Sequence, residues 1–356
     1  MVIFAILPFA ALIHIIGAFS ATFADVFNIH IASIFRAAWA YLTGWMPFSF
    51  AETIIIFLPA GLIFAIFGLV PRISDDRIKS IRYIFSLLSI LAYIYIAFVF
   101  TLATGYQGTS VTDKLGVERR GISVDELYET AAALTDMVNT LSEEVTFNAD
   151  GHSVMQYDLD ELNRKLNDAY VLASDKYDFI MPLRSNVKSI ALSEPMTYTH
   201  ISGVYTFFTG EANVNINFPD YTIVYTMAHE MSHQRGIAPE DEANFMAFLV
   251  CMQSDDPYIR YGGAQSLLEY VYSALARADR TLYKQVYSSL SVRVVDEMRA
   301  YNRFFDKYEE NVAATVSGTV NNTYLVLQGT EGTRSYGLVA DLAVICYIEG
   351  LLPVEP

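Results

Sequence analysis

Two histidines and a glutamate in one short stretch, His229-Glu230-Met231-Ser232-His233, form the pattern H-E-x-x-H. On an α-helix, residues four apart lie on the same face, so both imidazoles could bind one Zn²⁺. The glutamate is offset around the helix, where it could reach a water on the metal rather than the metal itself. The chain has only 6 histidines, and no other two have metal-ligand spacing. The stretch predicts a centre with one zinc ion, two histidine ligands and Glu230 as general base.

A catalytic zinc site needs a third protein ligand, and here carboxylates are available rather than another histidine. The residue six positions after the second histidine, where a metzincin-type site has its third, is Pro239. Gly236 predicts the end of the motif helix and Pro239 the first turn of the next helix, so the chain can fold back. We favour Glu240 as the third ligand because Asn244 follows one turn later and could hydrogen-bond it. Glu242 remains the rival, and the acidic cluster could instead only stabilise a helix N-terminus.

Three apolar runs lie before about residue 105, where the hydrophobic residues that make up 53% of the chain are concentrated. Each run is uncharged and long enough to cross a bilayer. The sequence therefore predicts a transmembrane region, residues 1–104, with spans at about Val2–Phe19, Thr53–Val70 and Tyr83–Thr104. Between the first two spans, Ser20–Glu52 has one basic residue, Arg36, and a tryptophan-rich end. This segment suits an interfacial or re-entrant element, and a packed helical hairpin remains the alternative.

Charge predicts how the chain is oriented in the membrane. The short connection Pro71–Arg82 is rich in lysine and arginine, so the positive-inside rule places it and the N-terminus in the cytoplasm. Residues 105–356 would then form an extracytoplasmic domain of a multi-pass cell-membrane protein. The net charge of −16 falls almost entirely on this domain, which argues against nucleic acid as a partner. Cys251 and Cys346 lie in apolar runs, which predicts buried thiols.

The predicted extracytoplasmic domain is α+β, with a small sheet and a mostly helical remainder. Period-two alternation predicts strands within 187–193, 203–208 and 212–218. Helical spacing predicts helices at Ser123–Leu141, within 151–174, at Thr222–Gln234, Pro239–Gln253, Ser266–Leu275, Ser289–Glu309 and Gly337–Leu352. The last is apolar but short and contains two acidic residues, so a core helix is expected rather than a fourth span.

H-E-x-x-H followed by E-x-x-A-N resembles the pattern of gluzincin-type metallopeptidases. The longer stretch Gly203–Gly263 is similar to a family of uncharacterised bacterial membrane proteins, a domain of unknown function assigned to the zincin-like peptidases. That resemblance covers almost the whole chain, including PFSFAE after the tryptophan-rich segment and the late Arg334–Gly337. It implies three N-terminal spans, a zincin fold and zinc dependence, and leaves the substrate open. One departure from the zincin consensus is Arg235, at a position that is usually apolar.

In an active site of this type, Glu230 would move the proton, and the strand within 203–217 could bind an extended peptide by β-augmentation. Oxyanion stabilisation needs a further donor, for which a group of aromatic and basic side chains offers candidates: Tyr258, Arg260, Tyr261 and Tyr336. Each of the tyrosines could equally be a packed aromatic residue. Glu211 could contact substrate or Arg235, or could simply end a hairpin.

The sequence thus favours a membrane-anchored zinc metallopeptidase that hydrolyses an extracytoplasmic peptide or an envelope protein of the bacterial cell envelope. The alternative is a non-catalytic zincin-like scaffold or envelope-assembly protein with a structural metal, although such a site does not need Glu230. An intramembrane protease is excluded because charged residues follow the motif too closely for a span. A transporter is disfavoured because the three spans carry no internal charge.

Overall fold

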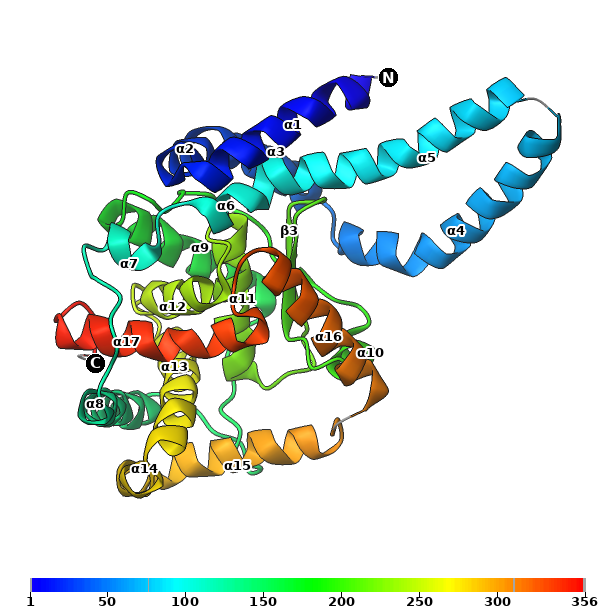
Figure 1. Ribbon diagram of the computed structural model, residues 1–356. Helices are drawn as coiled ribbons and strands as arrows, with labels where there is room; N and C mark the ends of the chain where they lie inside the picture. Colours follow the sequence, from blue (N-terminus) through cyan, green and yellow to red (C-terminus); the bar gives the residue numbers. More distant parts are fainter. Residues whose placement is uncertain (1, 76, 310, 355–356) are drawn as a thin grey trace.

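The computed structural model describes residues 2–75, 77–309 and 311–354. Three helices near the N-terminus are long and apolar enough to cross a membrane: α1 (Val2–Phe19), α4 (Phe50–Asp75) and α5 (Arg77–Phe98), the last continuing through η2 (Val99–Ala103) and α6 (Thr104–Gln107). They confirm that the three predicted apolar runs form helices long enough to be candidate spans. Figure 1 shows α4 and α5 as a hairpin that projects from the rest of the molecule, with α1 beside α5. The predicted connection Pro71–Arg82 is largely helical, and its Asp76 lies outside the described residues.

The segment between the first two spans is helical and packed. It comprises α2 (Ala21–Phe27), the π-helix η1 (Asn28–Ala32) and α3 (Ser33–Gly44), which contact α1, α6 and η2. Arg36, the one basic residue of this segment, is buried. The alternative of packed helices therefore describes this segment better than a re-entrant loop, although Trp45 and Phe48 at its end are exposed, as an interfacial element would have them.

The remaining helices form a domain below the spans in Figure 1. They are α7 (Val111–Lys114), α8 (Val124–Ser142), α9 (Leu159–Lys176), α10 (Ser193–Thr197), α11 (Asp220–Gln234), α12 (Glu240–Cys251), α13 (Pro257–Ala278), α14 (Arg280–Tyr287), α15 (Val292–Asp306), α16 (Val312–Leu327), the 3₁₀ helix η3 (Gly332–Leu338) and α17 (Val339–Ile348). The predicted helix that begins at Ser123 is α8, and it starts with a capping box in which Ser123 and Glu126 exchange hydrogen bonds. Helix α16 was not predicted, because its many valines and threonines have low helix propensity.

A small sheet of three strands lies beside α11: β1 (Lys188–Ser189), β2 (Gly203–Thr206) and β3 (Glu211–Val214). The central strand β3 pairs parallel with β1 and antiparallel with β2. Strands β1 and β2 fall within their predicted segments, and β3 begins one residue before its own; all three are shorter than predicted. Strand β2 is at the edge of the sheet, so its outer backbone groups are free of strand pairing.

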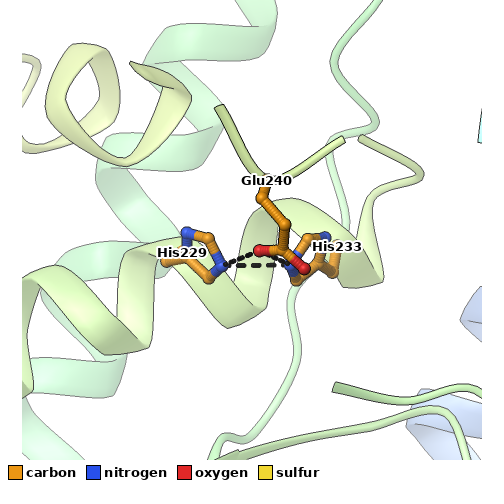
Figure 2. A group of neighbouring side chains, drawn as sticks. All are labelled: His229, His233 and Glu240. Carbon is orange, nitrogen blue, oxygen red and sulfur yellow. Dashed lines mark hydrogen bonds and ion pairs between the residues drawn. The ribbon is translucent and has the colours of Figure 1, made fainter. Parts of the chain in front are cut away.

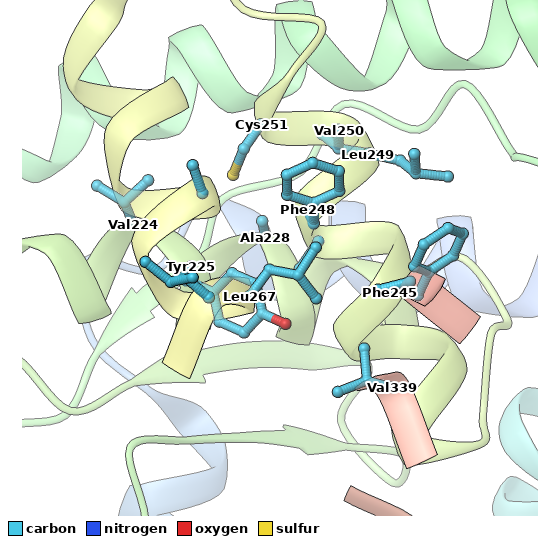
Figure 3. Close-up of a cluster of buried hydrophobic side chains, with 14 of the residues drawn as sticks. Val224, Tyr225, Ala228, Phe245, Phe248, Leu249, Val250, Cys251, Leu267 and Val339 are labelled. Carbon is cyan, nitrogen blue, oxygen red and sulfur yellow. The ribbon is translucent and has the colours of Figure 1, made fainter. Parts of the chain in front are cut away.

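The core of the domain is built where α11, α12 and α13 pack together (Figure 3). Val224 of α11, Phe248 of α12 and Leu267 of α13 are each fully buried there. Helix α17 adds Val339 to the same cluster, so the predicted core helix is confirmed, and α17 is not among the candidate spans of the described chain. Both cysteines are buried free thiols, as predicted. The two helices that carry the H-E-x-x-H stretch and the acidic cluster are thus fixed at the centre of the domain.

Candidate metal centre

The turn between α11 and α12 brings the acidic cluster back to the histidines. Helix α11 ends at Gln234, and Gly236 follows with a φ of +95°, a left-handed conformation that strongly favours glycine. Pro239 then caps α12, whose first residue is Glu240. The residues Gly236 and Pro239 therefore do what their types predict: one stops the first helix and the other starts the second.

The side chains of His229, His233 and Glu240 converge (Figure 2). The two Nε2 atoms are 3.0 Å apart, and Glu240 Oε2 lies 3.2 Å from Nε2 of His229 and 3.4 Å from that of His233. Tetrahedral nitrogen and oxygen ligands around zinc are separated by about 3.3 Å, given bonds of about 2.0–2.1 Å. The donor set and its spacing therefore fit a zinc ion, and no other such group occurs among the residues that the structure describes.

The surroundings of these three side chains favour a positive charge between them. His233 Nδ1 lies 2.8 Å from the carbonyl oxygen of Ile237, which orients Nε2 toward the group. Burial opposes protonation, yet the Glu240 carboxylate raises the pKa of His233 to about 9. Conversely, burial would raise the pKa of Glu240, but His233 and His229 hold it well below its usual value. The carboxylate is therefore ionised and available as a ligand.

The rival ligand Glu242 points away from the histidines. Its carboxylate accepts hydrogen bonds from the backbone N–H of Val111 at 3.0 Å and from Arg119 at 3.3 Å. Two residues further along a helix a side chain projects from the opposite side, which is why Glu240 and Glu242 cannot both face the histidines. Asn244, the expected partner of Glu240, is buried one turn later, but no hydrogen bond joins the two in the described chain. It lines the neighbouring cavity instead.

Glu230 lies beside this group and is held by the edge strand. Its carboxylate accepts a hydrogen bond from the backbone N–H of Tyr205 in β2. Burial raises the pKa of Glu230, and the positive charge of the two histidines opposes that rise. A carboxylate with a raised pKa suits a group that must both accept and return a proton near neutral pH.

A cavity of about 420 Å³ opens beside His229 and Glu230. Its wall is formed by residues 199–203 leading into β2, by α11, α12 and α13, and by α16 and η3. On α16 the cavity-lining residues recur at helical spacing: Ala314, Ser317, Gly318 and Asn321. These four side chains are small or polar, whereas tyrosines from α11, α13 and η3 line other parts of the wall, and Gly203 brings the start of β2 to the cavity. We refer to this cavity as the cleft.

Of the four predicted oxyanion donors, only Tyr336 lines the cleft. Asn321 Nδ2 donates to its hydroxyl oxygen at 3.3 Å, which leaves the hydroxyl proton free to donate elsewhere. Burial, followed by the negative charge of Glu240, holds the pKa of Tyr336 well above its usual value, so it stays protonated.

The other three candidates, Tyr258, Arg260 and Tyr261, do not reach the cleft. They lie in the first turn or two of α13, and only Tyr270, three turns later, reaches it. The hydroxyl of Tyr261 donates to the buried Glu297, and that of Tyr258 pairs with Ser153 Oγ at 3.2 Å. Tyr258 and Tyr261 are buried in the core and Arg260 is half-buried, so the structure brings none of these three to the cleft.

Glu211 also has a role that the sequence did not indicate. Its two carboxylate oxygens accept from the backbone N–H groups of Phe50 and Ala51, at 3.0 and 2.8 Å, at the start of α4. It therefore ties the sheet to a candidate span and contacts neither the cleft nor Arg235. Arg235 is buried and points away from the histidines, with its guanidinium 3.7 Å from the centre of the Tyr170 ring.

Several cleft residues were missed from the sequence, among them Asn321, Tyr270 and His200. Asn321 lies on the helix that was not predicted, so no pattern pointed to it. The sequence shows only that His200 precedes a predicted strand; its φ of 60°, which is uncommon for a residue other than glycine, is visible only in the structure. Its Nε2 lies 2.6 Å from the carbonyl oxygen of Tyr308, so it is held at the rim by hydrogen bonding.

Comparison with known proteins gives a family but no activity. A family model described as a protein of unknown function, DUF3810, matches residues 27–344, which is most of the chain. No curated protein and no solved structure matches it.

Proposed function

The chain belongs to the DUF3810 family of unknown function, and from the geometry of its metal-ligand group we propose a membrane-anchored, zinc-dependent metallopeptidase of the zincin-like, gluzincin type. One observation carries the proposal: His229, His233 and Glu240 converge at zinc-ligand spacing beside an open cleft that also contains the buried Glu230. A sheet whose edge strand runs beside the motif helix is in keeping with a zincin-like fold.

The proposed mechanism assigns one step to each side chain. Zinc, when bound, would polarise the scissile carbonyl and acidify the attacking water. Glu230 takes the proton of that water at its carboxylate and later returns it to the leaving nitrogen. The edge strand β2 aligns an extended peptide by hydrogen bonds from the main-chain groups that neither β3 nor Glu230 engages. Tyr336 donates a hydrogen bond from its hydroxyl to the carbonyl oxygen as negative charge develops there, and keeps its proton.

A purely structural metal site is the weaker proposal. Structural zinc sites are closed by four protein ligands, whereas this group has three among the described residues. Its neighbour is a cleft rather than packed apolar side chains. A buried carboxylate with no role in holding metal also has no purpose in such a scaffold.

Three candidate spans support a membrane anchor, and their arrangement supports an extracytoplasmic domain. The N-terminal end of α1, the C-terminal end of α4 and the N-terminal end of α5 all point away from the helical domain in Figure 1. Arg77, Lys79 and Arg82 lie near that end of α5, where the positive-inside rule predicts the cytoplasm. We propose that the substrate is a peptide or protein of the cell envelope.

The proposal is tested with the full-length protein in detergent and a quenched-fluorescence peptide library. We expect hydrolysis that a zinc chelator abolishes and that added zinc restores. Persistent activity after complete removal of the metal would exclude the zinc mechanism. If the zinc-loaded protein cleaves neither the library nor envelope proteins, the scaffold alternative is favoured instead.

Replacing Tyr336 with phenylalanine is expected to lower kcat by about 10²–10³-fold with little change in KM, because the lost hydroxyl acts on the transition state. Zinc content should remain at the wild-type level. The matched control is Tyr261→Phe, whose hydroxyl lies in the core and should affect stability rather than kcat. Equal kcat values for wild type and Tyr336→Phe would remove Tyr336 from the mechanism.

Replacing Gly203 with alanine is expected to displace the general base. A Cβ at this position would lie 2.5 Å from Thr226 Cγ2 and 2.7 Å from Glu230 Oε1, which is too close for either contact. A shift of about 1 Å in a catalytic group can lower the rate about 10²-fold, so kcat should fall while zinc stays bound. Gly121→Ala serves as control, since its Cβ would meet nothing within 4 Å.

A further inference from the structure

A second cavity, of about 270 Å³, lies between the segment that follows the first span and the soluble domain. On one side it is lined by η1 and α3, and on the other by residues 178–182 and the end of α11. Two arginines from opposite sides, Arg36 and Arg235, contribute to its wall and are only 1% and 2% exposed. Neither takes part in the proposed hydrolysis. We call this space the arginine cavity.

Among the described residues, the guanidinium of Arg36 hydrogen-bonds only to neutral groups. It donates to the Asn28 side-chain oxygen at 2.7 Å, the Asn28 carbonyl at 2.8 Å and the Thr101 carbonyl at 3.2 Å. A fourth contact, at 3.4 Å, reaches the carbonyl of Arg235. Its Nε is buried without a hydrogen-bond partner. The charge of Arg36 is therefore solvated by dipoles but not balanced.

The charge of Arg235 is also not balanced by a carboxylate in the described chain. Arg235 donates to the carbonyls of Met231 and Leu183 and to the side-chain oxygen of Asn167, and it stacks on Tyr170. Its Nε is also buried and lacks a partner. No ion pair with a carboxylate involves Arg36 or Arg235 in the part of the chain that the structure describes.

Two guanidinium groups without a counter-charge line one cavity, so the electrostatic potential there favours binding of an anion. Burying a charge without a counter-charge is costly, and an arginine cannot escape that cost by losing its proton. The one acidic residue on the wall, Asp178, is exposed and forms no ion pair with either arginine. A ligand that enters the arginine cavity and carries negative charge would remove the imbalance.

We propose that the arginine cavity binds a phosphate-bearing anion, either the head group of an anionic lipid or free phosphate. Guanidinium groups recognise phosphate oxygens through parallel N–H donors, and the volume equals that of about nine waters at about 30 Å³ each. One phosphate and its ester substituent fit such a space. Exposed Ile34 and Phe35 on α3, beside the cavity, are suited to the membrane surface from which a lipid would enter.

An occupant of this cavity would also support the candidate metal centre. Arg36 binds the carbonyl of Arg235, and Asn28 donates to the carbonyl of Gly236 at 3.0 Å. Both carbonyls belong to the turn that joins the two ligand-bearing helices. The binding site itself does not depend on the proposed hydrolysis.

The test uses full-length, metal-chelated protein, so that anions cannot bind at a zinc ion. One arm titrates inorganic phosphate into the protein in a neutral detergent by calorimetry. The other arm reconstitutes the protein in nanodiscs of phosphatidylcholine with or without phosphatidylglycerol and measures retained lipid by native mass spectrometry. We expect binding in at least one arm, and the arm identifies the source of the phosphate group.

Three variants locate the binding. Arg36→Gln and Arg235→Gln should weaken it about tenfold or more, because each removes a charged donor. Ser33→Leu keeps both arginines and fills the cavity, so it should weaken anion binding as much as the arginine variants do. If the arginine variants do not fold, this variant alone tests whether the anion binds in the arginine cavity. Arg164→Gln, an exposed arginine on α9, is the control and should bind as wild type does. Absence of wild-type binding in both arms, or unchanged binding in a folded Ser33→Leu variant, would overturn the proposal.

Discussion

Replacing His229 with alanine is expected to reduce bound zinc from about one ion per chain to nearly none. Its Nε2 lies 3.0 Å from Nε2 of His233 and 3.2 Å from Oε2 of Glu240, the other two proposed ligand atoms. Without His229 only two protein ligands remain, which are too few for a stable zinc site, and any zinc-dependent hydrolysis should disappear with the metal. Elemental analysis of the dialysed protein measures the stoichiometry directly.

A histidine of the same cleft provides the control for this prediction. His200→Asn should keep its zinc, because His200 binds the Tyr308 carbonyl rather than the metal group, and asparagine tolerates its positive φ. The glutamates form a second pair of variants: Glu240→Ala should lose zinc and Glu242→Ala should retain it. Zinc bound at full stoichiometry by His229→Ala would refute the site assignment.

The Glu230→Gln variant is expected to keep its zinc and to lose hydrolysis by about 10²–10⁴-fold, the range for removal of a general base. Glutamine preserves the size of the side chain and an oxygen that can accept from Tyr205 N–H, but it cannot take up the proton of the attacking water. Turnover of a library peptide and zinc content should be measured on the same preparation.

The control for this prediction is Glu194→Gln, the same substitution at an exposed glutamate, which should leave peptide turnover and zinc content unchanged. If Glu230→Gln and wild type cleave at the same rate, Glu230 is not the base and the mechanism fails, even if zinc is bound. The inactive, zinc-loaded variant also serves to retain substrate. Comparing envelope proteins that accumulate in cells carrying it with those in wild-type cells would identify the substrate.

The N-terminal helices, which include the candidate spans, and the helical domain contact each other through specific hydrogen bonds. Glu211 holds the start of α4, while Asn28 and Arg36 hold the turn between α11 and α12. These are buried, directional hydrogen bonds, which are lost if the two parts separate. The candidate metal centre is therefore better studied in the full-length protein than in an isolated domain.

The sequence by itself determined what depends on local spacing. Apolar runs of sufficient length predicted the spans, and positions four apart on a helix predicted that His229 and His233 share a face. The residue types Gly236 and Pro239 predicted a helix end followed by a helix start, and so a return of the chain. These features follow from backbone geometry and side-chain chemistry within a few residues.

Only the tertiary structure decided the features that join distant segments. Whether Glu240 or Glu242 meets the histidines depends on how α12 packs against α11, and spacing alone allowed either. Tyr336 became distinct from the other candidate donors only because η3 and α16 cover the cleft. The arginine cavity could not be foreseen, because Arg36 and Arg235 lie about 200 positions apart and no pattern in the sequence links them. Long-range packing places such residues together, and a single sequence contains no local signal of it.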